Sequence, residues 1–193
     1  MTIETVQRFG GIEGNAALTS AAAAVLIALL LAEGITIMDM GGLLTLHMVV
    51  GLVLIPPVLV KLGSTGYRFA RYYLRTPAYR EKGPPLIALR LLAPALVVTT
   101  IVVFATGVAL LILGHKSDLL LEVHKVSFIV WGVIFGVHVL GHLREMARSL
   151  RSDWTVPGAR ARLALLTTSI VAGLTVAVAV LPSISHWHGG HHG

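Results

Sequence analysis

The sequence predicts an all-α integral membrane protein with five transmembrane helices. Of its 193 residues, 55% are hydrophobic and 12% are charged, a balance too apolar for a water-soluble domain of this length. The apolar residues form five runs, each long enough to cross a bilayer as a helix. Cysteine is absent, which excludes disulfides, thiolate catalysis and iron–sulfur ligation.

The first helix is expected at about residues 16–37. No small-residue cleavage pattern follows its apolar run, so we interpret it as a retained anchor rather than a signal peptide. A short acidic, glycine-rich turn is expected around its end, at Glu33, Gly34, Asp39, Gly41 and Gly42. This turn leads into the second helix.

The second helix is expected at about residues 43–62, and the double proline Pro56-Pro57 should kink it. The segment 63–89 that follows interleaves basic and aromatic side chains. Such interleaving occurs in nucleic-acid-binding proteins, but beside a membrane span it indicates a belt at the lipid headgroups. The pattern therefore predicts membrane lipid as a partner and no nucleic acid.

Three further helices are expected at about residues 86–113, 119–147 and 163–181, completing a single transmembrane domain over 1–185. Of the fifteen Lys and Arg residues, all but Lys116 and Lys125 fall at the N-terminus or in the second and fourth connections. By the positive-inside rule this predicts a multi-pass protein of the cell (inner) membrane with a cytoplasmic N-terminus and an extracytoplasmic C-terminus. The His-rich tail 186–193 would then be extracytoplasmic, as a metal-binding tract or a disordered end.

Two histidines are expected at matching depth near the outer surface. His47 lies about four residues into the second helix and His124 about five into the fourth, and the two helices run in the same direction. Imidazoles at one level on separate helices can bind a haem iron from opposite faces. Without cysteine such a haem is b-type. Each histidine alone could equally be an interfacial side chain that reaches the headgroups.

Three glycines are placed where a porphyrin needs close approach to backbone. Gly51 lies one turn after His47, Gly132 two turns after His124, and Gly107 in the outer half of the third helix. We therefore predict a haem b site bounded by these glycines, with His47 and His124 as the axial ligands of the iron.

The inner half of the membrane holds a second histidine pair. His138 follows His124 by fourteen positions, which is close to four turns, on the same face and roughly 21 Å deeper. His142 lies one turn further on. This pair suits a second haem, a small metal ion or a quinone carbonyl, or it only caps polar groups. Aligning the helices puts Lys61 opposite His138, where a lysine more simply extends to the headgroups.

With FATGVALL in the third helix and VHKVSFIVWGVIFGVHVLGH in the fourth, the chain resembles the bacterial membrane cytochrome b family. Members of that family are the haem-bearing anchors of formate dehydrogenases, nickel-iron hydrogenases and related oxidoreductases. The likeness covers about half the chain and rests on Thr106-Gly107 and the spacing of His124 and His138. Two departures are Lys61, where a second bis-histidine site would need imidazole, and a first helix without histidine.

The resemblance implies a helical core with one or two haem b groups, of which His47, His124 and His138 would be ligands. It also implies electron transfer between a quinone pool and an extracytoplasmic or membrane redox protein. The chain would then be an electron-transfer subunit of an oxidoreductase rather than a stand-alone enzyme. The alternatives are a haem-free interaction subunit of a larger membrane complex and a proton-coupled transporter with histidines along its proton path.

Overall fold

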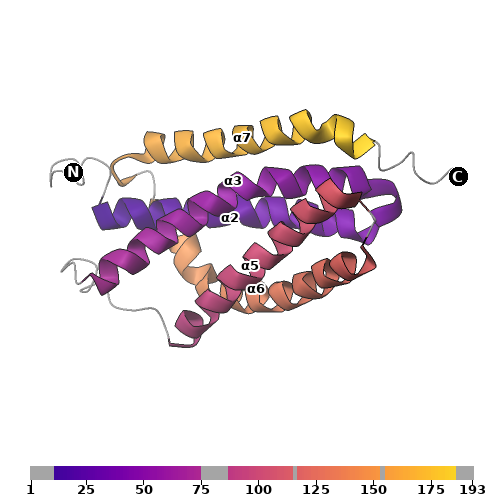
Figure 1. Ribbon diagram of the computed structural model, residues 1–193. Coiled ribbons are helices and arrows are strands. Elements are labelled where there is room, and N and C mark those ends of the chain that lie inside the picture. The colour runs from indigo at the N-terminus through magenta and orange to yellow at the C-terminus, as the bar shows by residue number, and fades with distance from the viewer. Residues whose placement is uncertain (1–10, 75–86, 115–116, 153–154, 186–193) are drawn as a thin grey trace, which may run out of the picture.

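The computed structural model describes residues 11–74, 87–114, 117–152 and 155–185, and the regular structure in these ranges is entirely helical. Its helices are α2 (Gly11–Met38), α3 (Met40–Tyr73), α5 (Ile87–Leu113), α6 (Asp118–Ser152) and α7 (Ala159–Ser185), as Figure 1 shows. Each of these five is long and apolar enough to cross a membrane. The predicted all-α fold is confirmed, and the chain is a multi-pass membrane protein.

Helix α2 begins at Gly11, before the expected start at about residue 16, and ends at Met38, next to the expected end at about residue 37. Glu33 and Gly34, expected in a turn, lie inside the helix, and the turn to α3 consists of Asp39 alone. The Asp39 carboxylate accepts a hydrogen bond from the Gly42 N–H at 3.1 Å and caps the start of α3. The expected acidic turn is therefore wrong at Glu33, because a single capping residue is enough to reverse the chain.

Helix α3 continues through Pro56 and Pro57 and ends only at Tyr73. Pro57 is fully buried, and helix neighbours in a membrane can compensate for the backbone donors that proline lacks. The helix therefore takes in the first part of the segment expected to lie along the headgroups. The remainder of that segment, residues 75–86, lies outside the described residues.

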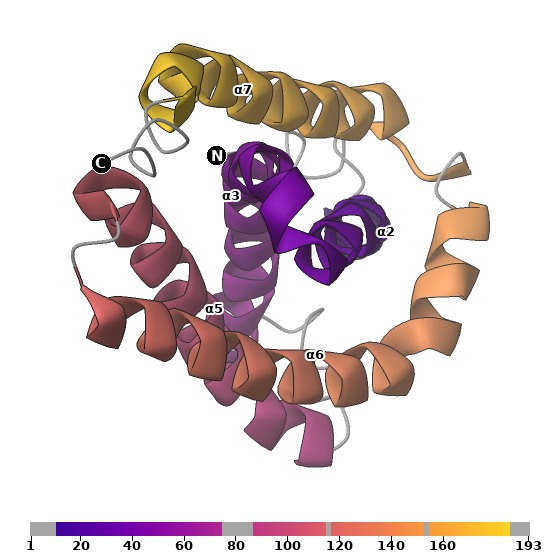
Figure 2. The ribbon, with the colours of Figure 1, turned by 90° about the vertical axis from the view of Figure 1, so that its right-hand side faces the viewer.

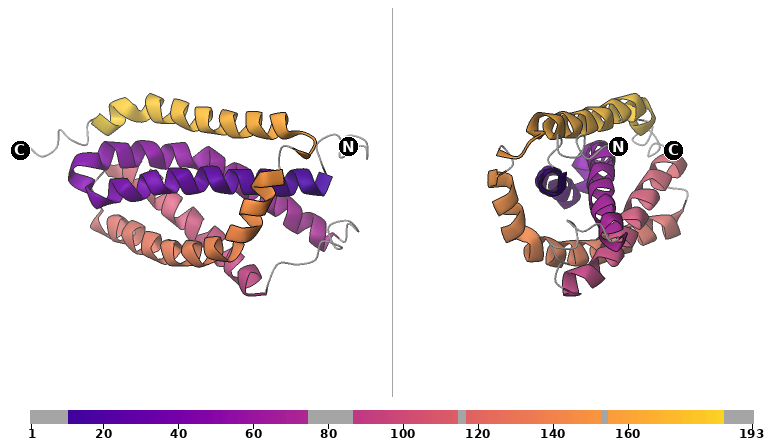
Figure 3. Two further views of the ribbon diagram at one scale, coloured as in Figure 1. Left: turned by 180° about the vertical axis from the view of Figure 1, so that it is seen from behind. Right: turned by 90° about the vertical axis from the view of Figure 1, so that its left-hand side faces the viewer.

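Helices α2 and α3 form the centre of the bundle. The end-on view of Figure 2 shows them enclosed between α7 on one side and α5 with α6 on the other, and the views of Figure 3 agree. A core cluster joins α3 to α7 through Leu52, Val53 and Ala177. Helices α5 and α6 pack mainly against each other, and α6 also contacts α2.

Large apolar side chains cover much of the outer surface. On α6 they include Ile129, Val133 and Leu140, which are 64%, 66% and 73% exposed. No residue of the most apolar stretch of α6 is buried within the chain. In a bilayer such side chains meet lipid tails, so the helices contact membrane lipid.

The crossing of α3 and α7 depends on Gly173. A Cβ atom at this position would lie 2.7 Å from the Val53 carbonyl oxygen and 2.8 Å from the Val53 Cα. We expect Gly173→Ala to lower the free energy of unfolding by about 1–3 kcal/mol, because backbone atoms cannot yield as a flexible side chain can. Thermal unfolding in detergent measures the loss.

The matched control for this prediction is Gly63→Ala in α3, where a Cβ would have no atom within 4 Å. Alanine there should leave the stability unchanged or raise it slightly, since alanine favours the helix over glycine. Equal unfolding temperatures for the two variants would contradict the close approach of α7 to α3.

Candidate functional site

Polar groups from four helices meet at one end of the bundle. The α2–α3 turn and the α5–α6 connection both lie at this end (Figure 1). His47 follows the first residue of α3 by seven positions, and His124 follows that of α6 by six. Glu33 lies five residues before the last residue of α2, and Thr106 lies seven before that of α5. The chain reversals therefore place these side chains at a common depth.

The rings of His47 and His124 lie next to each other across the gap between α3 and α6. Their centres are 6.4 Å apart and their planes are inclined by 77°. An imidazole nitrogen binds a transition metal at about 2 Å, so two rings on opposite sides of one metal have centres about 6 Å apart once the ring size is included. The separation of the two rings fits this arrangement.

The Nδ1 atom of His47 is held by two residues of α2. It lies 3.0 Å from Glu33 Oε1 and 3.1 Å from Thr36 Oγ1. The single hydroxyl hydrogen of Thr36 is already donated to the Glu33 carbonyl oxygen at 2.6 Å, so the hydroxyl oxygen can only accept. We infer that His47 carries its proton on Nδ1, which leaves a lone pair on Nε2.

The Nδ1 atom of His124 is held in the same way from α5. Thr106 Oγ1 lies 2.9 Å from it, and the Thr106 hydroxyl hydrogen is donated to backbone carbonyls one turn earlier, at 2.7 Å for Val102 and 3.0 Å for Val103. The Thr106 oxygen therefore accepts from His124 Nδ1–H, and Nε2 again keeps its lone pair. Metal-binding histidines are oriented by hydrogen bonds of this kind on their other nitrogen.

The two imidazoles thus form a matched donor pair. Histidines that only linked neighbouring helices would need their Nδ1 hydrogen bonds, but the two rings would not need to lie next to each other. Among the described residues no group of three or more His, Cys, Asp or Glu is gathered at one point as a protein-only metal site would require. A haem iron needs only two protein ligands, because the porphyrin supplies the other four nitrogens.

The three glycines expected around this site have different neighbours. A Cβ at Gly107 would lie 3.2 Å from His124 Cε1, so α5 approaches the ring itself. A Cβ at Gly51 would lie 3.5 Å from Glu33 Oε1, so this glycine leaves room for the carboxylate that holds His47. Gly132 has no atom within 4 Å of its Cβ position and borders open space on α6.

At the end of the bundle away from His47, Lys61 belongs to a polar network between α2 and α3. Its amino group donates to the Thr19 carbonyl oxygen at 3.0 Å, and the Thr19 hydroxyl lies 3.0 Å from that of Ser64. Asn15 donates to the Ser64 carbonyl oxygen at 3.2 Å. Lys61 is therefore directed toward α2 as an interhelical link, which differs from the expected extension to the headgroups.

His138 and His142 lie one turn apart on α6, with ring centres 4.7 Å apart. His142 Nδ1 lies 3.3 Å from Glu145 Oε2. The Nδ1 atom of His138 is buried and has no hydrogen-bond partner among the described residues. A buried nitrogen in this state is a place where a polar ligand could bind.

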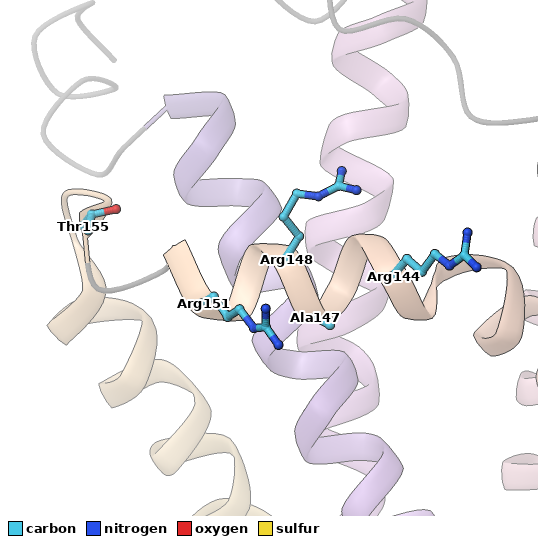
Figure 4. Close-up of a pocket in the computed structure, with 5 residues that line it drawn as sticks. All are labelled: Arg144, Ala147, Arg148, Arg151 and Thr155. Atoms are coloured by element: carbon cyan, nitrogen blue, oxygen red, sulfur yellow. The ribbon is translucent and has the colours of Figure 1, made fainter.

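A shallow cavity of about 530 Å³, largely open to the surface, lies at the C-terminal end of α6 and is lined by Arg144, Ala147, Arg148, Arg151 and Thr155. Figure 4 shows that the arginine side chains leave the helix in different directions and do not converge on one point. The cavity is at the opposite end of α6 from His124. It marks a basic end of the bundle and is not part of the histidine site.

Two residues that shape the site were missed in the sequence analysis, Glu33 and Thr36. Glu33 could have been found, because an acidic residue within an apolar helix is a functional candidate by default; it was instead assigned to the turn. Thr36 gives no comparable signal, since threonine is common in membrane helices. The His-rich tail 186–193 lies outside the described residues.

No protein-family model, no curated protein and no solved structure matches this chain. What the chain does must therefore be inferred from its own geometry, and the pair formed by His47 and His124 is the feature with the clearest chemical meaning.

Proposed function

We propose that this chain is a membrane cytochrome b subunit that carries one haem b between His47 and His124 and passes electrons through it. The observation that supports this most strongly is the 6.4 Å separation of the two rings. The hydrogen bonds of the two Nδ1 atoms also support it. The Nδ1 of His47 contacts Glu33 and Thr36, and that of His124 contacts Thr106. Both Nε2 lone pairs are then available for one metal.

A haem bound here would supply a one-electron couple. His47 and His124 would hold the iron together, and a haem held by two histidines would supply electron transfer rather than oxygen binding. Thr106 and the α2 pair would keep the ring orientations fixed in both oxidation states. The chain would thus serve as an electron-transfer subunit of an oxidoreductase.

The distribution of charge supports an orientation in the cell (inner) membrane. Basic residues gather at the end of the bundle away from the histidine site, including Arg68, Arg71, Arg144 and Arg151. By the positive-inside rule that end is cytoplasmic, together with the N-terminus. The site formed by His47 and His124 would then lie near the extracytoplasmic face, within reach of a redox protein there or in the membrane.

The inner histidine pair supports a quinone as the second redox partner. The unpartnered, buried Nδ1 of His138 is suited to hydrogen-bond a quinone carbonyl, with His142 and Glu145 beside it for proton exchange. A second haem at His138 would need a ligand opposite, and Lys61 is engaged with the Thr19 carbonyl instead. We therefore propose a single haem, with a quinone at the inner end.

The direct test is the pigment of the purified full-length chain, produced in cells with ample haem supply and extracted in mild detergent. We expect about one haem b per chain and a reduced-minus-oxidised spectrum of the low-spin b type. Iron measured per chain should agree with the haem content. Protein that is folded, helical and colourless under these conditions would overturn the proposal.

The same measurement separates the two rival interpretations. A haem-free interaction subunit or a proton-coupled transporter would bind no stoichiometric haem, and its histidines would serve only as interhelical links or proton carriers. Haem at far less than one per chain, unchanged by added haem, would favour these classes.

A further inference from the structure

Glu33 is a carboxylic acid buried inside a membrane-spanning helix. Its side chain is 11% exposed, and Oε2 is buried without a hydrogen-bond partner in the described part of the chain. Placing such a group in a membrane interior has a free-energy cost, and leaving one oxygen unpaired adds to it. An ionisable residue buried at this cost is a candidate for function.

Glu33 is not the only residue that holds His47 in place. Thr36 alone already accepts from Nδ1 at 3.1 Å, as Thr106 alone does for His124 at 2.9 Å. The neighbouring Gly51 keeps the space beside Glu33 Oε1 open, with its Cβ position 3.5 Å from that oxygen. The Glu33 carboxylate is thus a second acceptor for the Nδ1–H of His47, whereas the Nδ1–H of His124 has only the Thr106 hydroxyl.

The two imidazoles consequently have different chemistry. The Nδ1–H of His47 points to a carboxylate oxygen at 3.0 Å, whereas the Nδ1–H of His124 points to a neutral hydroxyl. An anionic acceptor draws the proton away from the ring and makes the ring a stronger electron donor toward a metal. A metal held by such a ring is stabilised in its oxidised state, so its reduction potential falls.

We propose that Glu33 is a positioning residue that lowers the reduction potential of the haem site through its hydrogen bond to His47. This inference rests on the function proposed above. It assigns to the carboxylate a role in the energetics of electron transfer, distinct from the role of Thr36 and Thr106 in fixing the rings.

The test is potentiometric titration of the haem-loaded chain and of Glu33→Gln, which keeps the size of the side chain and removes its negative charge. We expect the variant to keep haem and to favour the ferrous form at least about tenfold more than the wild type, a rise of about 59 mV for a one-electron couple. Glu122→Gln is the matched control, because Glu122 lies two residues from His124 on α6 but is 64% exposed and pairs with Lys125. It should leave the potential unchanged.

If Glu33→Gln loses its haem, the reduction potential of Thr36→Val tests the role of Glu33 instead. This variant leaves the carboxylate as the only acceptor for His47 Nδ1–H, so the potential should fall below that of the wild type. A haem-bearing Glu33→Gln at the wild-type potential, or an unchanged or raised potential in Thr36→Val, would overturn the role of Glu33 while leaving the haem site intact. A wild-type chain without haem would instead refute the proposed function itself.

Discussion

Replacing His47 or His124 with alanine is expected to abolish stoichiometric haem binding. Each substitution removes one of the two neighbouring rings and would leave a single histidine to hold the haem. The loss of affinity should exceed the roughly 10–100-fold change typical of altering a group that merely supports a ligand. Haem per chain and the b-type difference spectrum of purified protein measure the effect.

His142→Ala is the control for these two substitutions. It removes an imidazole from α6, the helix that carries His124, but at the opposite end, where His142 contacts Glu145 and His138. Its haem content should match that of the wild type. A b-type spectrum that persists in the His47→Ala, His124→Ala double variant would mean that the haem sits elsewhere.

Gly107→Leu is expected to displace the His124 ring and to cause a comparable loss of haem. The first atom of the new side chain would already lie 3.2 Å from His124 Cε1, with Nδ1 at 3.7 Å. The remaining leucine atoms therefore have to occupy the place of the ring, and the hydrogen bond to Thr106 at 2.9 Å has to break. Haem content and the low-spin signal in electron paramagnetic resonance report the displacement.

Gly136→Leu provides the comparison for Gly107→Leu. Gly136 lies on α6 and has no atom within 4 Å of its Cβ position, so leucine there can extend outward without moving a helix. We expect normal haem content and normal extraction from membranes. If Gly107→Leu also kept full haem and an unchanged resonance signal, the contact between α5 and the His124 ring would be refuted.

The helices could be predicted from the sequence because membrane helices are marked by long apolar runs. The expected segments at about 86–113 and 119–147 lie close to α5 (Ile87–Leu113) and α6 (Asp118–Ser152). The ends of α2 and α3 were harder to place. Glycine and proline, which interrupt helices in water, are tolerated in membrane helices. Gly34, which was also assigned to a turn, lies inside α2, and α3 continues from the expected end at residue 62 to Tyr73.

The candidate site could be predicted in part. Depth along a helix follows from residue number, and this placed His47 and His124 at one level. Rotation about the helix axis and the identity of the facing neighbour depend on packing, which residue number does not contain. The pairing of Glu33 with His47, and of Thr106 with His124, is therefore visible only in the structure.

Each imidazole is fixed by a helix other than its own. His47 belongs to α3 and is held from α2, while His124 belongs to α6 and is held from α5. Neither ring can turn without breaking a hydrogen bond to a neighbouring helix. In the proposed haem site, a donor set held in this way would change its shape very little as an electron arrives or departs, so nuclear rearrangement would add only a small barrier to electron transfer.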